Sequence, residues 1–288
     1  MTPVLTKLSD VRRLIERWNL RPQKPLGQNF LIDANILGIL LETAAVSAAD
    51  RVIEVGPGLG VVTEPLARSA GHVVAVEKDP RLWPLLEERL APYPNVDLVR
   101  GDILELDLER LLGSGIDKVV SNLPYSVGSA ILVNFVRAAA PPASLTVTLQ
   151  QEVADRLTAA PGCKAFGLLT LWTQLRYDVS IRKLVNPGCF YPAPGVRSAI
   201  LSLKRRAEPD PLPQERAFFY ALTKRAFAGR RKQLGTVLAQ AGPALARAAR
   251  EGAPWREAGI DPRTRPEELG VSDWLRLSRA LNPGGESR

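Results

Sequence analysis

The 288-residue sequence contains a single histidine and only two cysteines. A zinc site needs more histidine and cysteine ligands than this chain holds. A nucleophilic site that depends on histidine would have to use His72, which stands at the start of a predicted buried strand. We therefore interpret His72 as structural and expect chemistry that needs neither a metal nor a histidine base. Cys163 and Cys189 are the only cysteines in the sequence. So few cysteines argue against a disulfide framework and are typical of a protein from a reducing compartment.

The sequence also lacks a long hydrophobic run. Its longest uncharged stretch, Val119–Val136, contains Asn122 and Pro124 and would make a poor membrane span. Met1–Asp10 has no apolar core of a signal peptide. We therefore expect a cytoplasmic protein with no membrane partner.

Positive charge is concentrated in the last third of the chain. Residues 1–181 hold 18 Lys/Arg and 20 Asp/Glu, whereas residues 182–288 hold 20 Lys/Arg and 10 Asp/Glu. This asymmetry favours a nearly neutral catalytic part joined to a basic part that binds a polyanion; a basic face that meets only solvent is the alternative. Arg230, Arg231 and Lys232 form a cationic turn that is either a phosphate contact or a solvated turn.

A glycine-rich turn follows a short hydrophobic strand at Arg51–Val55. Glycines at 56, 58 and 60 follow at once, and Glu54 precedes them. Gly56 and Gly58 allow a sharp turn and a close approach of a ligand to the backbone. The spacing is G-x-G-x-G rather than the G-x-G-x-x-G of dinucleotide sites, and the acid before it favours S-adenosylmethionine. An ordinary strand-to-helix turn is the alternative.

Strands and helices alternate through the first two thirds of the chain. We predict strands at 51–55, 72–76, 96–100, 117–121 and 145–149, and helices at 61–69, 79–90, 128–138 and 151–159. Segments 168–182 and 196–203 are typical of two more strands, or of a strand and a helix. This alternation predicts a mostly parallel, Rossmann-like α/β sheet.

Ligands of such sheets bind beyond the carboxyl ends of the strands. Gly56, Glu77, Asp102 and Asn122 all stand at predicted strand ends, so we expect them to line one crevice. Glu77 lies 21 residues after Gly56, where folds of this kind place a carboxylate that binds the ribose hydroxyls.

We predict three segments. Residues 1–27 form a basic N-terminal helix (8–20) and linker, residues 28–204 a methyltransferase domain, and residues 205–288 a smaller all-helical RNA-binding domain. The last begins with a proline-rich linker, 205–213, and continues with helices at 215–227, 232–241, 244–251 and 272–281. Gln28 and Asn29 directly precede a helix at 32–45, where they either cap it or reach a ligand.

The stretch Ser121–Tyr125 (SNLPY) is the most specific local motif. Its strand delivers Asn122 to the crevice, and Pro124 stiffens the turn. The Asn122 oxygen and a backbone carbonyl could accept from the exocyclic amine of a base, and Tyr125 could stack on a flipped base. A buried β-turn is the alternative.

The ordered motifs resemble the ribosomal RNA adenine dimethyltransferase family, of the bacterial KsgA type. They are GQNFL (27–31), EVGPGLG (54–60), VEKD (76–79), GD (101–102), NLPY (122–125), QQEVADRL (150–157), KAFG (164–167), FYPAPGVRSA (190–199), RRK (230–232) and RPEEL (265–269). They extend over nearly the whole chain.

The resemblance implies transfer of methyl groups from S-adenosylmethionine to two adjacent adenosines near the 3′ end of small-subunit rRNA, in a pre-ribosomal particle. By the same resemblance, the cofactor-binding residues are Gln28, Asn29, Leu31, Gly56, Gly58, Glu77, Asp102 and Asn122. The catalytic residues are Asn122, Leu123, Pro124 and Tyr125. We expect a monomer.

The sequence departs from the family pattern at four positions. Ser126 and Thr236 replace frequent asparagines, and Gln151 and Gly195 replace common lysines. Because the acceptors and Tyr125 remain, these departures bear on RNA affinity more than on chemistry. Two other functions stay open: an RNA-binding assembly factor without turnover, and a large-subunit rRNA methylase that confers antibiotic resistance.

Overall fold

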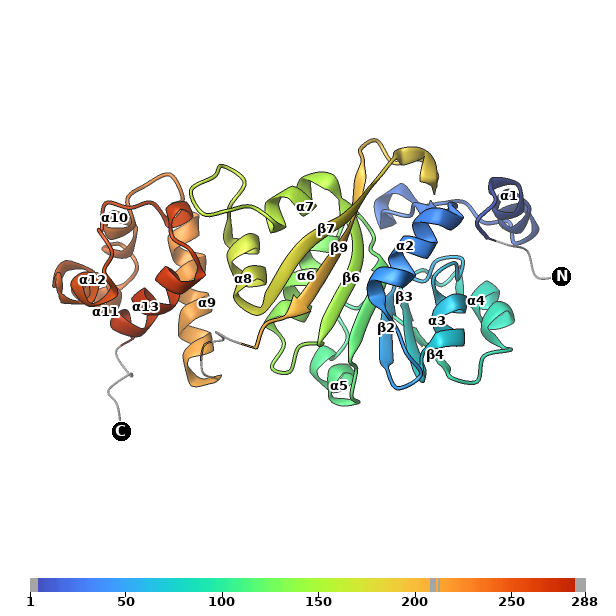
Figure 1. The fold of residues 1–288 in the computed structure, drawn as a ribbon, viewed down its shortest axis with the longest axis horizontal. Helices are drawn as coiled ribbons and strands as arrows, with labels where there is room; N and C mark the ends of the chain where they lie inside the picture. Colours follow the sequence, from blue (N-terminus) through green and yellow to red (C-terminus); the bar gives the residue numbers. More distant parts are fainter. Residues whose placement is uncertain (1–4, 208–210, 212, 283–288) are drawn as a thin grey trace. The chain divides into compact units, whose positions relative to one another are not determined.

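The computed structural model describes residues 5–207, 211 and 213–282. Contacts divide this part of the chain into two compact units. The first comprises the described residues up to Ala154 together with Asp178–Arg205, and the second comprises Asp155–Tyr177 and the described residues from Arg206 onward. The elements of both are labelled in Figure 1.

A seven-stranded sheet with the order β4-β3-β2-β5-β6-β9-β7 forms the centre of the first unit. Its strands are β2 (Arg51–Val55), β3 (His72–Glu77), β4 (Val96–Arg100), β5 (Lys118–Asn122), β6 (Ser144–Gln150), β7 (Tyr177–Val185) and β9 (Ser198–Arg205). The pairs from β4 through β6 are parallel, and β9 is antiparallel to β6. The predicted mostly parallel, Rossmann-like sheet is confirmed.

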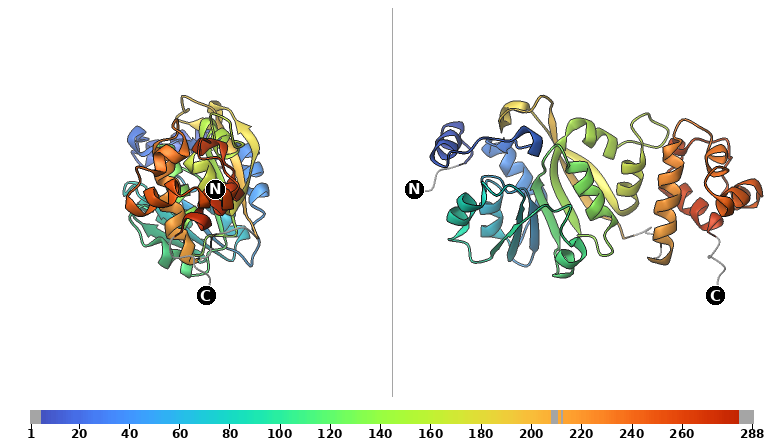
Figure 2. Two further views of the ribbon diagram at one scale, coloured as in Figure 1. Left: turned by 90° about the vertical axis from the view of Figure 1, so that its left-hand side faces the viewer. Right: turned by 180° about the vertical axis from the view of Figure 1, so that it is seen from behind.

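Helices cover both faces of this sheet, as a parallel sheet of hydrophobic strands requires. Helix α2 (Ala34–Ala44) lies in front of the sheet in Figure 1, and α6 (Gly128–Arg137) lies behind it, as the rear view in Figure 2 shows. The remaining helices here are α3 (Thr63–Ser69), α4 (Trp83–Leu90), α5 (Leu108–Gly113) and α7 (Gln151–Leu157), whose last three residues belong to the second unit. Because β2 through β6 run parallel, the crossovers between them return the chain so that these strands end at the same edge.

A second, two-stranded sheet joins segments that are distant in the sequence. Strand β1 (Phe30–Leu31) pairs antiparallel with β8 (Phe190–Tyr191). Strands of two residues leave no periodicity to recognise, and neither was predicted. The pairing brings the GQNFL motif to the proline-rich FYPAPG loop, which directly follows the short helix η2 (Pro187–Cys189).

The N-terminal segment packs with the first unit. Helix α1 (Leu8–Arg17) buries Val11, Leu14 and Ile15 in a hydrophobic cluster that also contains Phe190. The short helix η1 (Lys24–Leu26) then leads into the glutamine and asparagine before β1. By contacts, the segment predicted as residues 1–27 is thus continuous with the sheet domain.

The second unit consists of helices in the described residues. They are α8 (Leu168–Arg176), α9 (Pro213–Ala228), α10 (Leu234–Leu238), α11 (Pro243–Arg250), α12 (Ala253–Ala258), η3 (Pro266–Glu268) and α13 (Val271–Leu281). The predicted helical character of the C-terminal part is confirmed. Of the predicted linker 205–213, residues 208–210 and 212 lie outside the described part.

The predicted boundary at 204/205 differs from the contact division, which groups residues 155–177 with the C-terminal helices. The reason is the packing of α8. The indole Nε1 of Trp172 donates to Thr223 Oγ1 on α9 at 3.0 Å, and the backbone N–H of Arg206 donates to the Arg176 carbonyl at 2.8 Å. The segment 168–182 is accordingly a helix followed by β7.

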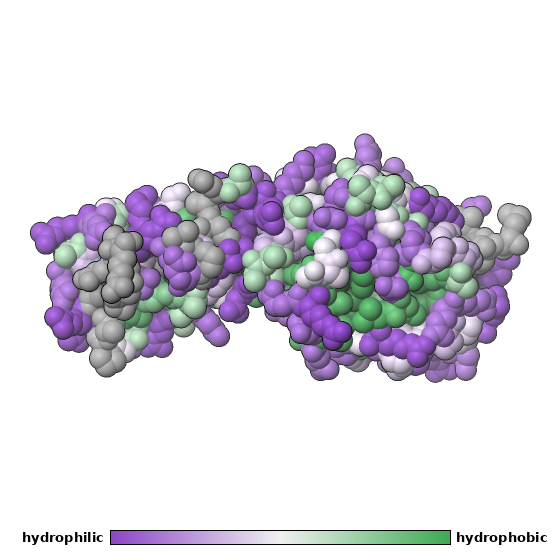
Figure 3. Space-filling view, turned by 90° about the horizontal axis from the view of Figure 1, so that it is seen from below, coloured by the Kyte–Doolittle hydropathy of each residue, from purple (hydrophilic) through white to green (hydrophobic). Residues whose placement is uncertain are grey.

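Large hydrophobic side chains are mostly buried. Those exposed among the described residues are Leu8, Leu184 and Val196. Seen from below, hydrophilic residues cover most of the visible face, and hydrophobic residues gather in one recessed area of the first unit (Figure 3). Within the described part of the chain, no helix is both long and apolar enough to span a membrane.

Candidate functional site

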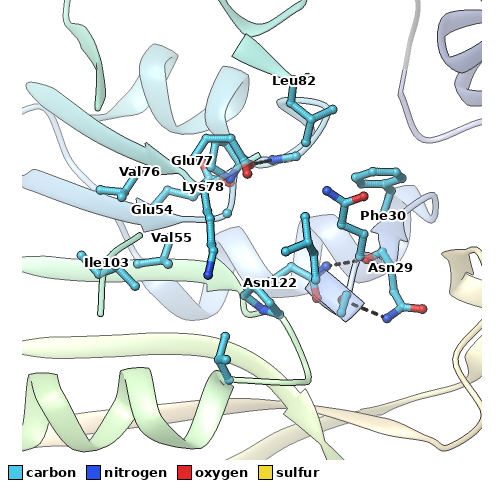
Figure 4. A pocket seen from close by; sticks show the side chains of 18 of the residues that line it. Asn29, Phe30, Glu54, Val55, Val76, Glu77, Lys78, Leu82, Ile103 and Asn122 are labelled. Carbon is cyan, nitrogen blue, oxygen red and sulfur yellow. Dashed lines mark hydrogen bonds between the residues drawn. The ribbon is translucent and has the colours of Figure 1, made fainter. Parts of the chain in front are cut away.

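A pocket opens at the carboxyl ends of β2, β3, β4 and β5 and is bordered by the N-terminal segment. Its empty volume is about 970 Å³, including solvent at its mouth, and Figure 4 shows part of its lining. The structure brings together nine of the predicted site residues in this lining: Gln28, Asn29, Leu31, Gly56, Gly58, Glu77, Asp102, Asn122 and Pro124. Four separate strand ends thus converge as the topology predicts.

The glycine loop is constrained by its neighbours as well as by its turn. Gly56 and Gly58 have φ values of +71° and +59°, a region that glycine adopts without strain. A Cβ at Gly58 would lie 3.0 Å from the ring of Phe30, and a Cβ at Gly56 would lie 3.4 Å from Pro124. The loop therefore needs glycine at both positions for its turn, and at Gly58 also for the close packing of Phe30, whereas the distance to Pro124 is an ordinary contact.

Glu77 lies at the end of β3 and is only 5% exposed. Its Oε2 accepts the backbone N–H of Gly58 at 3.1 Å, and its Oε1 accepts that of Asp79 at 2.7 Å. Burial raises the pKa of the Glu77 carboxyl, and these backbone donors offset part of that effect. The carboxylate is fixed in position beside the glycine loop (Figure 4).

Glu54, on β2, lines the same pocket and is 1% exposed. Its Oε2 has no hydrogen-bond partner among the described residues. Burial raises the pKa of Glu54 to about 8; the Thr63 hydroxyl acts to lower it, and the charge of Glu77 acts to raise it. The sequence marks Glu54 only as the acid before the glycine loop, because burial and hydrogen-bond partners cannot be read from a sequence.

Asp102 lies after β4 and is already occupied by protein donors. Its Oδ2 accepts from Lys78 Nζ at 2.6 Å, and its Oδ1 accepts the N–H of Leu104 at 2.9 Å. Burial favours the protonated acid, but the bonds from Lys78 and Leu104 outweigh it and lower the pKa of Asp102. The residue is therefore an ionised acceptor at the rim of the pocket.

Asn122 is the last residue of β5, and the nitrogen and oxygen of its side-chain amide differ in their hydrogen bonding. Its Nδ2 donates to the carbonyl of Asn29 at 2.9 Å, and the Asn29 side chain donates to the Gly27 carbonyl at 3.1 Å. The Asn122 Oδ1 is buried and has no partner among the described residues. The pocket therefore contains an oriented amide oxygen with free acceptor capacity (Figure 4).

Gln28 is anchored to the protein. Its Nε2 donates to Asp79 Oδ2 at 2.8 Å, and its Oε1 accepts the N–H of Gln23 at 2.8 Å. These bonds hold the N-terminal segment against the loop that follows β3. A cofactor contact by Gln28 stays a prediction.

Leu123 and Tyr125 are outside the lining of this pocket. The Tyr125 hydroxyl is hydrogen-bonded to Ser198 Oγ, and its ring meets Phe190 edge-on with centroids 6.3 Å apart. Burial raises the pKa of Tyr125 to about 12, so the phenol stays neutral. Ser198 and Phe190 were missed as site residues, although both belong to the quoted FYPAPGVRSA motif.

The three residues of the cationic turn in the second unit differ in their contacts. The Arg230 side chain pairs with Glu267 and donates to the Lys164 carbonyl, so three quoted motifs meet at this arginine. Arg231 and Lys232 are exposed. Of the three predicted RNA-binding residues, Arg230 is thus engaged within the fold, whereas the other two are exposed; RNA contact by all three stays a prediction.

His72 lies at the amino end of β3, the end of the strand away from the pocket, where its Nε2 is 2.9 Å from Asp97 Oδ2. Among the described residues, no group of three or more His, Cys, Asp or Glu side chains is placed to hold a metal ion.

Ser126 is one of the four positions at which the sequence departs from the family pattern, and it lines the pocket. A Cβ added at Gly27 would lie 2.9 Å from the Ser126 Oγ.

Comparison with known proteins agrees with the motifs. The model of the ribosomal RNA adenine dimethylase family matches residues 19–282. The chain belongs to this family. It is 39% identical to ribosomal RNA small subunit methyltransferase A of Listeria welshimeri, over 93% of each chain. It is 40% identical to the protein of the same name from Geobacter metallireducens, over 91% of this chain and 96% of that one.

Solved structures support the same fold. A dimethyladenosine transferase from Plasmodium falciparum superposes with a TM-score of 0.72 at 20% identity, over 86% of this chain and 95% of that chain. The 23S rRNA methyltransferase ErmE superposes with a TM-score of 0.65 at 28% identity, over 88% of this chain and all of that chain. The resemblance stated from the motifs is confirmed at the level of the family.

The buried Glu54 predicts a specific pH dependence of stability. Its pKa rises from 4.5 in the unfolded chain to about 8 in the fold, so the folded state binds its proton more tightly. The contribution of the protonated carboxyl is present below pH 4.5 and is lost as the pH rises through 8. Glu54→Gln should therefore flatten the decline of the thermal midpoint between pH 5 and 8.

Thermal unfolding of the parent and the variant in one buffer series measures this difference. Glu42→Gln, at an exposed acid on α2, is the matched control and should retain the parent slope. Parallel pH profiles of the parent and Glu54→Gln would contradict the buried, unpaired state of Glu54.

Proposed function

We propose that this protein transfers methyl groups from S-adenosylmethionine to the exocyclic amines of two adjacent adenosines near the 3′ end of small-subunit rRNA, forming dimethyladenosines. The observation that carries this proposal is the unpaired Oδ1 of Asn122, an oriented acceptor in the pocket of a ribosomal RNA adenine dimethylase family member. Membership of the family and the names of the similar proteins support the substrate class.

The hydrogen-bonding groups that line the pocket match those of S-adenosylmethionine. Glu77 offers a fixed carboxylate for the ribose hydroxyls, and ionised Asp102 offers an acceptor for the adenine amine. The glycine loop brings backbone close to the pocket. When bound, this cofactor supplies a methyl group activated by a positively charged sulfur.

Asn122 and the turn after it would orient the target base. Asn122 Oδ1 and a backbone carbonyl of the turn accept the two N–H groups of the amine, which directs its lone pair toward the methyl group. Tyr125 offers a ring already held by Ser198 and Phe190, so stacking costs little further ordering. Pro124 stiffens the connection between them. The methylated amine is at first cationic and loses one proton to water. Catalysis then rests on proximity and orientation, and no strong base is needed.

The biological setting follows from the same proposal. The substrate is small-subunit rRNA in a pre-ribosomal particle, the protein acts as a monomer, and its compartment is the cytoplasm. The basic residues in the last third of the sequence supply attraction for phosphate. Exposed Arg231 and Lys232 are the phosphate contacts of the helical unit.

Two other functions are distinguished by experiment. ErmE, named as a 23S rRNA methyltransferase, shares the fold, whereas the Listeria and Geobacter relatives carry small-subunit names at higher identity. An assembly factor without turnover would bind the particle and leave its RNA unmodified. The three functions therefore predict different outcomes: methylated small-subunit rRNA, methylated large-subunit rRNA, or no methylated nucleotide.

Methyl transfer to immature small subunits tests the function directly. We expect labelled methyl groups on two adjacent adenosines near the 3′ end of the small-subunit rRNA, identified by mass spectrometry after nuclease digestion. Immature large subunits are the matched control and should remain unlabelled. Label in the large-subunit rRNA, or binding without any label, would replace the proposal by one of the alternatives.

Loss of phosphate contacts should change the salt dependence of RNA binding. Replacing Arg231 and Lys232 together by Ala should reduce the slope of log K against log salt by about 1.4–1.8 units, because each phosphate contact contributes about 0.7–0.9. Filter binding at several salt concentrations measures the slope.

Arg230→Ala serves as the comparison variant. It breaks the pair with Glu267, so it should lower the thermal midpoint, whereas the double variant should leave the midpoint nearly unchanged. An unchanged salt slope in the double variant would show that the turn only meets solvent.

A further inference from the structure

The segment 186–197, which connects the neighbouring strands β7 and β9, ends in an exposed hydrophobic residue followed by an unpaired cation (Figure 1). Val196 is 49% exposed, the largest fraction among the exposed large hydrophobic residues of the described chain. Arg197 is exposed, and its side chain makes no hydrogen bond or ion pair with any described residue. The proposed mechanism gives neither residue a role.

The backbone of this pair is held close to Tyr125. Ser198, the next residue along the chain, is fully buried, and its hydroxyl is hydrogen-bonded to that of Tyr125. Consecutive Cα atoms are about 3.8 Å apart, so the Cα atoms of Val196 and Arg197 lie within roughly 7.6 Å of that of Ser198. The backbone N–H of Gln151 donates to the Arg197 carbonyl at 2.9 Å. The pair is therefore fixed beside the ring to which we assign the target base.

The charge of Arg197 is not compensated by the protein. It is the only charged residue in segment 186–197. Glu152 follows Gln151 at the start of α7, yet it makes no ion pair with Arg197 in the part of the chain that the structure describes. Gly195 adds no side chain, and a Cβ built there would meet no atom within 4 Å. The loop thus offers open space and a free positive charge.

An RNA strand fits these features better than a protein does. A guanidinium presents its N–H donors in the geometry of phosphate oxygens, and contacts with phosphates set the position of a nucleic acid on a protein. A flipped base brings its neighbouring nucleotides to the site, and enzymes that flip bases contact these neighbours too. A protein interface, in contrast, buries about 800 Å² on each partner, far more than one exposed valine supplies.

We propose that Val196 and Arg197 form a subsite for the nucleotide next to the target adenosine, in which Arg197 binds its phosphate and Val196 packs against its sugar or base. This inference rests on the proposed function, because it assumes that Tyr125 stacks on the target base. Two adjacent adenosines can enter the site in two registers. A subsite on one side of the target holds the second adenosine in one register and a different nucleotide in the other, so it distinguishes between them.

Binding of immature small subunits at several salt concentrations tests the phosphate contact without measuring activity. Arg197→Ala should bind roughly tenfold more weakly, because a hydrogen bond to a charged group is lost. Its slope of log K against log salt should fall by about 0.7, the value for one phosphate of a single strand. Arg197→Lys keeps the charge and should keep the slope.

Arg110→Ala is the matched control, since Arg110 is an exposed arginine on α5 with no side-chain partner among the described residues. It should keep both the affinity and the slope of the parent. Arg197→Ala should also retain the thermal midpoint and the affinity for S-adenosylhomocysteine, the demethylated cofactor, because its side chain has no contact within the fold to lose.

The early products of single-turnover methyl transfer report the register. Mass spectrometry after nuclease digestion gives the ratio of methyl groups on the two adenosines. At saturating particle, Arg197→Ala and Val196→Ser should each change this ratio, by roughly threefold or more for Arg197→Ala, because the lost contact stabilises one register more than the other. The double alanine variant of Arg231 and Lys232 should weaken binding and keep the parent ratio.

Each contrary result has a distinct meaning. A parent-like salt slope in Arg197→Ala would show that this arginine meets only solvent and would overturn the inference. A reduced slope together with the parent ratio would also overturn it, because the phosphate would then lie away from the target adenosine. If the parent protein transfers no methyl group to the particle, the proposed function itself fails, and this inference fails with it.

Discussion

One hydrogen bond, from Asn122 Nδ2 to the Asn29 carbonyl, determines how the pocket presents its acceptor. It fixes which end of the amide faces the carbonyl, and so leaves Oδ1 as the unpaired end. It also joins the end of β5 to the N-terminal segment, 93 residues earlier in the chain. The same segment positions Gln28 against Asp79 and Phe30 against the glycine loop. Cofactor pocket and target acceptor are therefore parts of one connected structure.

The stacking residue depends on a second connection to distant sequence. Tyr125 is fixed by Ser198 through its hydroxyl and by Phe190 through its ring. The β1–β8 pair ties the loop that carries Phe190 to the strand that carries Phe30. Orientation in the proposed reaction thus relies on contacts among three motifs, GQNFL, NLPY and FYPAPGVRSA. A site without a general base can work by orientation because these contacts are formed within the protein itself.

Much of the site could be predicted from sequence because the topology of a parallel sheet is itself predictive. Once alternating strands and helices are recognised, Gly56, Glu77, Asp102 and Asn122 must meet at one edge. Features that depend on partners far away in the sequence could not be predicted. The ion pair of Arg230 with Glu267 and the grouping of residues 155–177 with the C-terminal helices are of this kind. The unpaired state of Glu54 is another, since it depends on where every neighbouring charge finds its partner.

The central claim is that an oriented Asn122, rather than a general base, carries the chemistry. The most direct test is the single-turnover rate of methyl transfer at saturating cofactor and RNA, compared between Asn122→Ala and Asn134→Ala. Asn134 is exposed on α6 and lies outside the pocket lining, so its replacement should leave the rate near that of the parent. Asn122→Ala should lose about a hundredfold, the typical cost of misplacing a reacting group. Equal losses in both variants, or a parent-like rate in Asn122→Ala, would contradict the account.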